Sequence, residues 1–291
     1  MKKINIITLI LVTFGLLFAG CSGDGDSRTS GFGGAGSGSS SSGGNGGVVV
    51  DFAENQPPSE IFKGNKYNFA FVIKNHLEHP ITDLQIKTKG YDRGFVTGLD
   101  ESYDVSNVPA ASEQAGPGVY PGLIVSGISV DGFEGDYNFN PTFDYAYSAK
   151  STFAEQICVP SKVNSCDVDV SASTSQNGIL KIKFDRINSV EDRVRLEFTV
   201  INQGDGQVVN EFFNTENYAP KYSLDFVKLG TISGECSPVG SENYQIIGGK
   251  AQFYCDFKRS GDDSYASQVT AELSYKYQQS VQKKIKVKSL N

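Results

Sequence analysis

Two stretches of ten residues decide the fold, KYNFAFVIKN at residues 66–75 and RVRLEFTVIN at residues 193–202. In both, apolar side chains recur at every second position, which predicts a strand with one buried face and one solvated face. Both end in Asn, whose side chain can bond the following backbone and start a turn. We therefore interpret them as equivalent strands of two domains of related design.

Similar alternation recurs along the rest of the chain, at residues 84–86, 137–147, 180–184, 269–277 and 281–287. Pro141 interrupts the second of these stretches, since proline cannot donate to a strand ladder. Gly, Pro, Asn and Asp separate the stretches, and no helical period is sustained, so the sequence predicts an all-β chain of two antiparallel sandwiches. Lys284, Lys286 and Lys288 on the polar face of the last stretch predict an exposed edge strand.

The start of the first domain carries a further pattern. Pro57-Pro58 is followed by IFKG at residues 61–64 and then by the alternating strand that ends in Asn75. This order resembles the immunoglobulin-like domains of archaeal and bacterial surface proteins, of the cell-adhesion-related and S-layer-associated types. The resemblance covers the starts of both halves of the chain. It implies tandem immunoglobulin-like β-sandwiches in a surface lipoprotein and says little about activity.

The N-terminus reads MKKINIITLILVTFGLLFAGC, with a charged start, an apolar run at residues 6–18 and the small pair Ala19-Gly20 before Cys21. This layout predicts a secretory signal peptide over residues 1–20, and the run is short for a membrane-spanning helix. The segment LFAGC resembles the lipobox of prokaryotic lipoproteins, which implies that Cys21 is lipidated and becomes the mature N-terminus. Two alternatives stay open: a cleaved signal with an incidental cysteine, and an uncleaved anchor helix.

Residues 21–47 are expected to form a disordered Gly/Ser tether after the lipidated cysteine. Of the 26 residues from 22 to 47, 19 are Gly or Ser. Such a segment cannot bury enough apolar surface to offset its ordering entropy. The predicted organisation is thus a signal peptide (1–20), a tether (21–47), a first sandwich domain (48–160) and a second (161–291).

The charge of the chain bears on its partners. The formal net charge is −7, and removing residues 1–20 takes away Lys2 and Lys3 and leaves −9. An acidic body repels phosphate backbones, so we expect no nucleic-acid partner. Attachment to a membrane is expected through the lipid on Cys21.

Five cysteines fit one lipid site and two disulfides in an oxidising compartment. Four body cysteines allow three connectivities, and proximity in sequence favours Cys158–Cys166 and Cys236–Cys255. A four-cysteine metal site is the alternative, although the chain has no CxxC spacing.

Three weaker site signals have two interpretations each. Asp131, Glu134 and Asp136 form either an acidic hairpin or a Ca²⁺ site. His76 and His79 lie in a solvated turn or, with Glu78, in a partial metal site. The aromatic residues at 137–147 form either a buried strand face or a platform for sugar rings.

The sequence indicates no catalytic residues and no cofactor. We expect a non-enzymatic binding or structural module of the cell envelope, extracytoplasmic and lipid-anchored, with a protein or glycan partner. A polysaccharide- or solute-binding lipoprotein is the alternative, and a surface hydrolase is a third. A bare sheet edge would favour the first, a pocket with convergent polar groups the second, and carboxyl groups of raised pKa in a cleft the third.

Overall fold

The computed structural model describes residues 47–131, 134–161, 178–190, 192–214, 220–238 and 244–289. Every regular element in these residues is a strand, which confirms the all-β class. The strands are β1 (Val48–Phe52), β2 (Glu60–Phe62), β3 (Lys66–Asn75), β4 (Leu84–Lys89), β5 (Val96–Thr97), β6 (Ser102–Val105), β7 (Gly118–Val130), β8 (Tyr137–Phe139), β9 (Thr142–Val159), β10 (Leu180–Val190), β11 (Arg193–Asn202), β12 (Gln207–Val209), β13 (Lys221–Leu229), β14 (Ile232–Ser233), β15 (Glu235–Ser237), β16 (Tyr244–Gln245), β17 (Lys250–Lys258), β18 (Tyr265–Gln282) and β19 (Ile285–Lys288). The predicted signal peptide, Cys21 and all of the tether before residue 47 lie outside the described residues.

The two similar stretches form strands with the predicted bounds, β3 and β11. Their partners match as well: β1 pairs with β3 so that Val48 is opposite Asn75, and β10 pairs with β11 so that Leu180 is opposite Asn202. The two stretches are therefore similar both in sequence and in the position of their partner strands.

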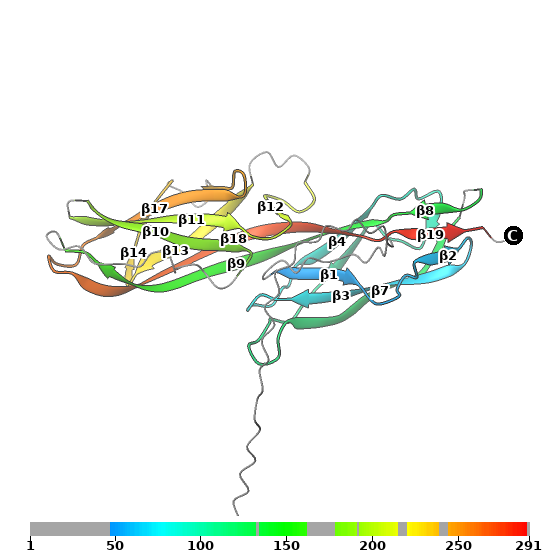
Figure 1. Ribbon diagram of the computed structural model, residues 1–291, viewed down its shortest axis with the longest axis horizontal. Helices are drawn as coiled ribbons and strands as arrows, with labels where there is room; N and C mark the ends of the chain where they lie inside the picture. The colour runs from blue at the N-terminus through cyan, green and yellow to red at the C-terminus, as the bar shows by residue number, and fades with distance from the viewer. Residues whose placement is uncertain are drawn as a thin grey trace, which may run out of the picture. The chain divides into compact units, whose positions relative to one another are not determined.

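One sheet of the structure spans both halves of the chain, in the order β14-β13-β18-β9-β4-β6. Its two central strands, β9 and β18, pair antiparallel over 18 residues each without a register shift (Figure 1). The order is symmetric about this central pair, because β9 is followed outward by β4 and β6, and β18 by β13 and β14. We call it the shared sheet.

Two four-stranded sheets pack against the shared sheet. The first has the order β1-β3-β7-β5 and the second β10-β11-β17-β15. Ring contacts show the packing: the centroids of Phe71 and Phe143 are 4.8 Å apart, and those of Phe153 and Phe198 are 6.1 Å apart. Phe143 and Phe153 lie on the same face of β9, since their spacing in the strand is even. The body is thus sandwich-like at two places along β9 and β18, which we call the first end and the second end.

The core runs through both ends as one cluster of buried side chains. Phe139, Phe143, Tyr145 and Tyr147 belong to it, which confirms that this aromatic stretch is a buried face. Asn140 and Pro141 separate β8 from β9, as expected from the proline. Where the ends meet, the Tyr147 hydroxyl accepts a hydrogen bond from the Val48 amide at 3.0 Å. The Tyr275 hydroxyl likewise accepts one from the Ile179 amide at 2.9 Å. The first residue of β1 and the residue before β10 are therefore each hydrogen-bonded to a tyrosine of the shared sheet.

The prediction that the last strand is an exposed edge is wrong. β19 is the middle strand of a three-stranded sheet, parallel to β2 and antiparallel to β8. Its lysines lie beside carboxylates: Lys288 Nζ is 2.5 Å from Glu60 Oε2, and Lys286 Nζ is 3.7 Å from Asp136 Oδ2. The lysines therefore pair with neighbouring acids instead of protecting an edge.

Strand pairing crosses the predicted boundary between residues 160 and 161. β9 precedes it and β18 follows it, yet the two pair along their whole length. After β18 the chain returns to the first end, where β19 lies between β2 and β8. The described residues contain no helix with the length and apolar character needed to cross a membrane.

Candidate functional site

A groove of about 660 Å³ lies on the outward face of the shared sheet, and we call it the central groove. Its floor is the middle of the β9–β18 ladder, where Ser148 is opposite Lys276 and Lys150 is opposite Ser274. These four residues point away from the core because their neighbours Ala149 and Tyr275 point into it. The walls come from the loop between β3 and β4, the end of β12 and the start of β13.

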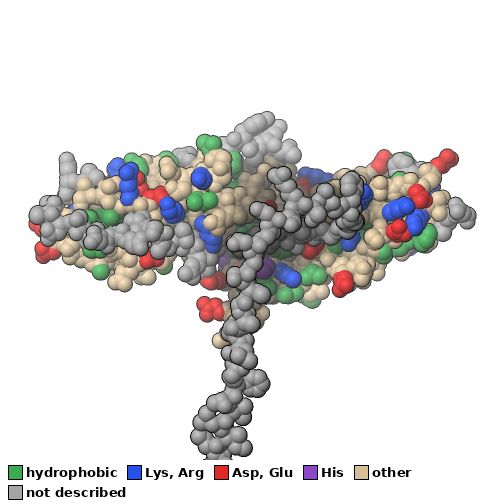
Figure 2. All heavy atoms as spheres, viewed as in Figure 1, with side chains coloured by type: hydrophobic (Ala, Val, Ile, Leu, Met, Phe, Trp, Pro, Cys, Tyr) green, Lys and Arg blue, Asp and Glu red, His purple; other side chains and the backbone are tan. Residues whose placement is uncertain are grey.

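Among the residues that the structure describes, those that line the groove include three lysines and one histidine but no Asp or Glu. They are His79, Ser148, Ala149, Lys150, Val209, Asn210, Lys221, Tyr222, Ser223, Ser274, Tyr275 and Lys276. This bias contrasts with the net charge of −7 for the chain. On the face of the molecule in Figure 2, basic and acidic side chains are interspersed. Lysine is therefore the charged residue type among the described residues that line the groove, although the chain as a whole is acidic.

Three carboxylates lie next to the groove and are already bonded. The Asp83 carboxylate accepts hydrogen bonds from the backbone and side chain of Ser148, and Asp225 accepts one from the Ser274 hydroxyl. Glu272 accepts a hydrogen bond from the Lys150 ammonium at 2.8 Å. This ion pair raises the pKa of Lys150 and offsets its charge. The Lys150 ammonium therefore already has a carboxylate partner.

His79 forms part of the wall through its imidazole. Its Nε2 atom accepts a hydrogen bond from the Lys150 amide at 3.3 Å, so the ring is neutral with its proton on Nδ1. Desolvation by burial lowers the pKa of His79, and the nearby Lys150 lowers it further. The neighbouring His76 is exposed, and its pKa is also lowered by desolvation and by Lys74. Neither imidazole lies in a group of metal-ligating side chains within the described residues.

Lys221 and Lys276 provide the remaining positive charge, and both side chains are exposed. The Lys221 amide donates a hydrogen bond to Asn210 Oδ1 at 2.9 Å, which fixes the backbone at the start of β13. The Lys276 ammonium lies 5.5 Å from the centre of the Phe212 ring. Within the described residues, neither ammonium group forms an ion pair.

A second exposed surface is the outer side of β7, which we call the β7 edge. β3 pairs with β7 on one side, whereas β5 pairs on the other side only with Ser129 and Val130. Val119 is 51% exposed and Ile124 is 64% exposed, and both lie in the stretch that β5 does not reach. Among the described residues, this part of β7 has no strand partner on its outer side.

The carboxylates of the acidic turn do not converge on one point. Asp131 accepts a hydrogen bond from the Ser129 hydroxyl at 3.1 Å, while Asp136 accepts one from the Ser289 amide at 3.2 Å and lies near Lys286. Glu134 is exposed, and residues 132–133 lie outside the described residues. In the part of the chain that the structure describes, these carboxylates do not form a cluster able to hold a metal ion.

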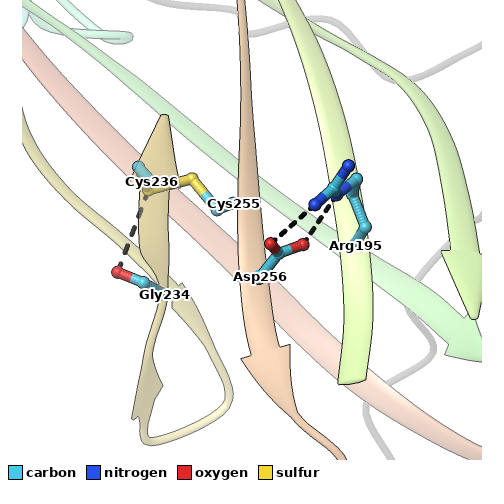
Figure 3. The surroundings of a disulfide bond; sticks show 5 residues. All are labelled: Arg195, Gly234, Cys236, Cys255 and Asp256. Carbon is cyan, nitrogen blue, oxygen red and sulfur yellow. Dashed lines mark hydrogen bonds and ion pairs between the residues drawn. A yellow bond between two sulfur atoms is a disulfide. The ribbon is translucent and has the colours of Figure 1, made fainter. Parts of the chain in front are cut away.

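The Cys236–Cys255 disulfide is present, with the two residues directly opposite each other on β15 and β17 (Figure 3). Next to Cys255, Asp256 points to the opposite face of β17 and accepts two hydrogen bonds from Arg195, at 2.7 and 2.8 Å. This ion pair lowers the pKa of Asp256. Cys166 lies outside the described residues, so the pair Cys158–Cys166 stays a prediction.

Sequence reasoning missed the central groove. Its residues come from five separate segments, and none of them forms a motif. The alternation of β9 and β18 gave one signal, since it placed lysine and serine on the solvated face. No protein-family model matches the chain, and no curated protein matches it either.

Proposed function

We propose that this protein is an extracytoplasmic lipoprotein, anchored through Cys21, that acts as a non-enzymatic binding or structural module of the cell envelope. The observation that carries the binding role is the β7 edge. Its outward backbone groups, except the nitrogen of Pro121, which carries no hydrogen, can pair with a strand of another protein, and strand addition of this kind is a common mode of recognition. Val119 and Ile124 would add apolar contacts to that strand.

The shared sheet supports a structural role. Because β9 and β18 pair without interruption, the two ends are joined by a continuous ladder. We further propose that each end is an immunoglobulin-like unit, with residues 48–160 and 161–291 as the two copies and the last part of the chain returning to the first end. The symmetric strand order and the equivalent positions of β3 and β11 support this interpretation.

Capture of a solute or saccharide is the second candidate, and the central groove favours it. The groove has the volume of a small-ligand site, roughly 300–1,000 Å³, and several polar side chains converge on it. This candidate is compatible with the same anchor and the same body.

The anchor is tested by mass spectrometry of the N-terminal peptide from the native membrane fraction. We expect a peptide that begins at residue 21 and carries acyl chains. A Cys21→Ala variant should leave the membrane fraction, whereas a Ser22→Ala variant should stay in it. An unmodified Cys21 behind an intact leader would contradict the proposed localisation.

The binding role is tested by capture of partners from intact envelope with the tagged full-length protein. A partner that uses the β7 edge should be recovered by the native protein and lost with a Val119→Lys, Ile124→Lys variant. The matched control is Ile247→Lys, because Ile247 is 75% exposed and lies at the second end. Equal recovery by both variants would show that the β7 edge is not the binding surface.

A further inference from the structure

We infer that the central groove binds an acidic saccharide, with the ammonium groups of Lys221 and Lys276 as its charge partners. This inference deepens the ligand-binding candidate of the proposed function, and it does not depend on the lipid anchor. The starting observation is the distribution of charge. Lys150 is paired with Glu272, but Lys221 and Lys276 have no carboxylate partner among the described residues.

Because Lys221 and Lys276 are unpaired cations, the ligand is expected to be an anion. The nearby carboxylates of Asp83 and Asp225 keep their charge, since their hydrogen bonds come from neutral groups of Ser148 and Ser274. The ammonium groups of Lys221 and Lys276 can each pair with an anionic group of a ligand, because neither forms an ion pair with a described carboxylate. A ligand carboxylate would therefore meet cations without first displacing a protein anion. Charge-assisted hydrogen bonds of this kind are stronger than neutral ones.

The backbone of the floor offers few free groups for strand addition. The amides of Ser148 and Lys150 donate to the side chains of Asp83 and His79. On β18, Ser274 pairs with Ser223 of β13, and Lys276 pairs with Val209 of β12. These amides and the backbone of β18 are therefore not available to a peptide strand, which favours recognition by side chains.

The side chains that remain available fit a saccharide. The hydroxyl of Ser223 and the ammonium groups of Lys221 and Lys276 surround a floor whose backbone is already bonded. A sugar ring can present its hydroxyl groups to these polar side chains and its C–H groups to the floor of the groove. The volume of about 660 Å³ suits a ligand of a few sugar rings.

The test uses the full-length protein and two α-1,4-linked disaccharides, digalacturonic acid and galactobiose, which carry carboxylates and hydroxymethyl groups, respectively, at C6. Calorimetric titration at low salt should show binding of digalacturonic acid and at least roughly fivefold weaker binding of galactobiose. Added salt should weaken the binding of the acid, since exposed charges are screened. Equal binding of the two disaccharides, or binding of neither, would overturn the inference.

Two variants locate the site. Lys221→Gln and Lys276→Gln should each weaken the binding of digalacturonic acid by roughly fivefold or more. The matched controls are Lys66→Gln and Lys258→Gln, which remove the same charge from exposed strand positions outside the groove. A loss of affinity that is equal in the controls would show that only the net charge matters, against the proposed site.

Two further probes separate the ligand classes. Inorganic phosphate and tetraglutamate carry negative charge without a sugar ring. Tighter binding of either one than of digalacturonic acid would overturn the assignment to a saccharide. The thermal unfolding midpoint of each variant checks that it is folded, and Lys221→Gln alone suffices if Lys276→Gln does not fold. If none of these titrations shows binding, mass spectrometry of the N-terminal peptide can still confirm the lipid anchor. Failure of this inference is therefore distinguished from failure of the proposed localisation.

Discussion

Asn75 and Asn202 close their strands with the same pair of hydrogen bonds. Asn75 Oδ1 accepts from the Leu77 amide at 2.9 Å and its Nδ2 donates to the His79 carbonyl at 2.8 Å. Asn202 Oδ1 accepts from the Gly204 amide at 3.1 Å and its Nδ2 donates to the Gly206 carbonyl at 3.0 Å. In both cases the partners are two and four residues further along the chain. The turn is therefore built by the asparagine itself.

We expect Asn75→Ala to lower the free energy of unfolding by about 1–3 kcal/mol, because it leaves buried backbone groups without partners. Asn75 is fully buried and also donates to the Pro109 carbonyl at 2.8 Å. Asn202 is partly exposed, so Asn202→Ala should cost less, about 1 kcal/mol. Urea unfolding measures both. Asn68→Ala, at an exposed position of β3, is the control, and a loss as large as that of Asn75→Ala would contradict this account.

Removing the hydroxyl group should have opposite effects on stability at two buried tyrosines, Tyr147 and Tyr222. The Tyr147 hydroxyl accepts the Val48 amide, so Tyr147→Phe leaves that amide unpaired and should destabilise by about 1–2 kcal/mol. The Tyr222 hydroxyl is buried with no partner among the described residues. Tyr222→Phe should therefore be neutral or stabilising by up to about 1 kcal/mol. Thermal unfolding compares the two, and destabilisation by Tyr222→Phe would indicate an unseen partner for its hydroxyl.

The disulfide between Cys236 and Cys255 should stabilise the second end. It closes a loop with a sequence separation of 19. The loss of chain entropy in the unfolded state predicts a contribution of about 3 kcal/mol. A Cys236→Ala, Cys255→Ala variant should lose this amount in denaturant unfolding under oxidising conditions. If the variant unfolds at the same denaturant concentration as the native protein, the disulfide contributes nothing to stability.

Acidification should weaken the fold through His79. Its pKa is lowered in the folded state by burial, so the unfolded chain binds a proton more readily. The stability contributed by neutral His79 is present above its unfolded pKa of about 6.5, and it is lost as the pH falls through the lower folded value. Protonation also removes the acceptor for the Lys150 amide.

The measurement is the free energy of unfolding between about pH 7 and pH 5, the range below the unfolded pKa of histidine. His79→Asn should flatten this dependence in part, and His76→Asn should remove a further part, because the pKa of His76 is lowered as well. A His79→Asn variant with the same dependence on pH as the native protein would show that His79 is not responsible.

The sequence by itself determined the strands and the direction of their side chains. The alternation at residues 66–75 and 193–202 gave β3 and β11 with their ends, since side chains in a strand alternate between faces whatever the strand packs against. The same local rule identified the buried face at Phe143, Tyr145 and Tyr147, and short separation identified the pair Cys236–Cys255.

Only the tertiary structure decided which strands are neighbours. The pairing of β9 with β18 joins residues 142–159 to residues 265–282, and the pairing of β19 with β2 and β8 makes a predicted edge strand a central one. The alternation of a strand fixes which side chains share a face, but it carries no information about the partner strand. The central groove exists because that long-range pairing brings Lys150, Lys221 and Lys276 to one surface.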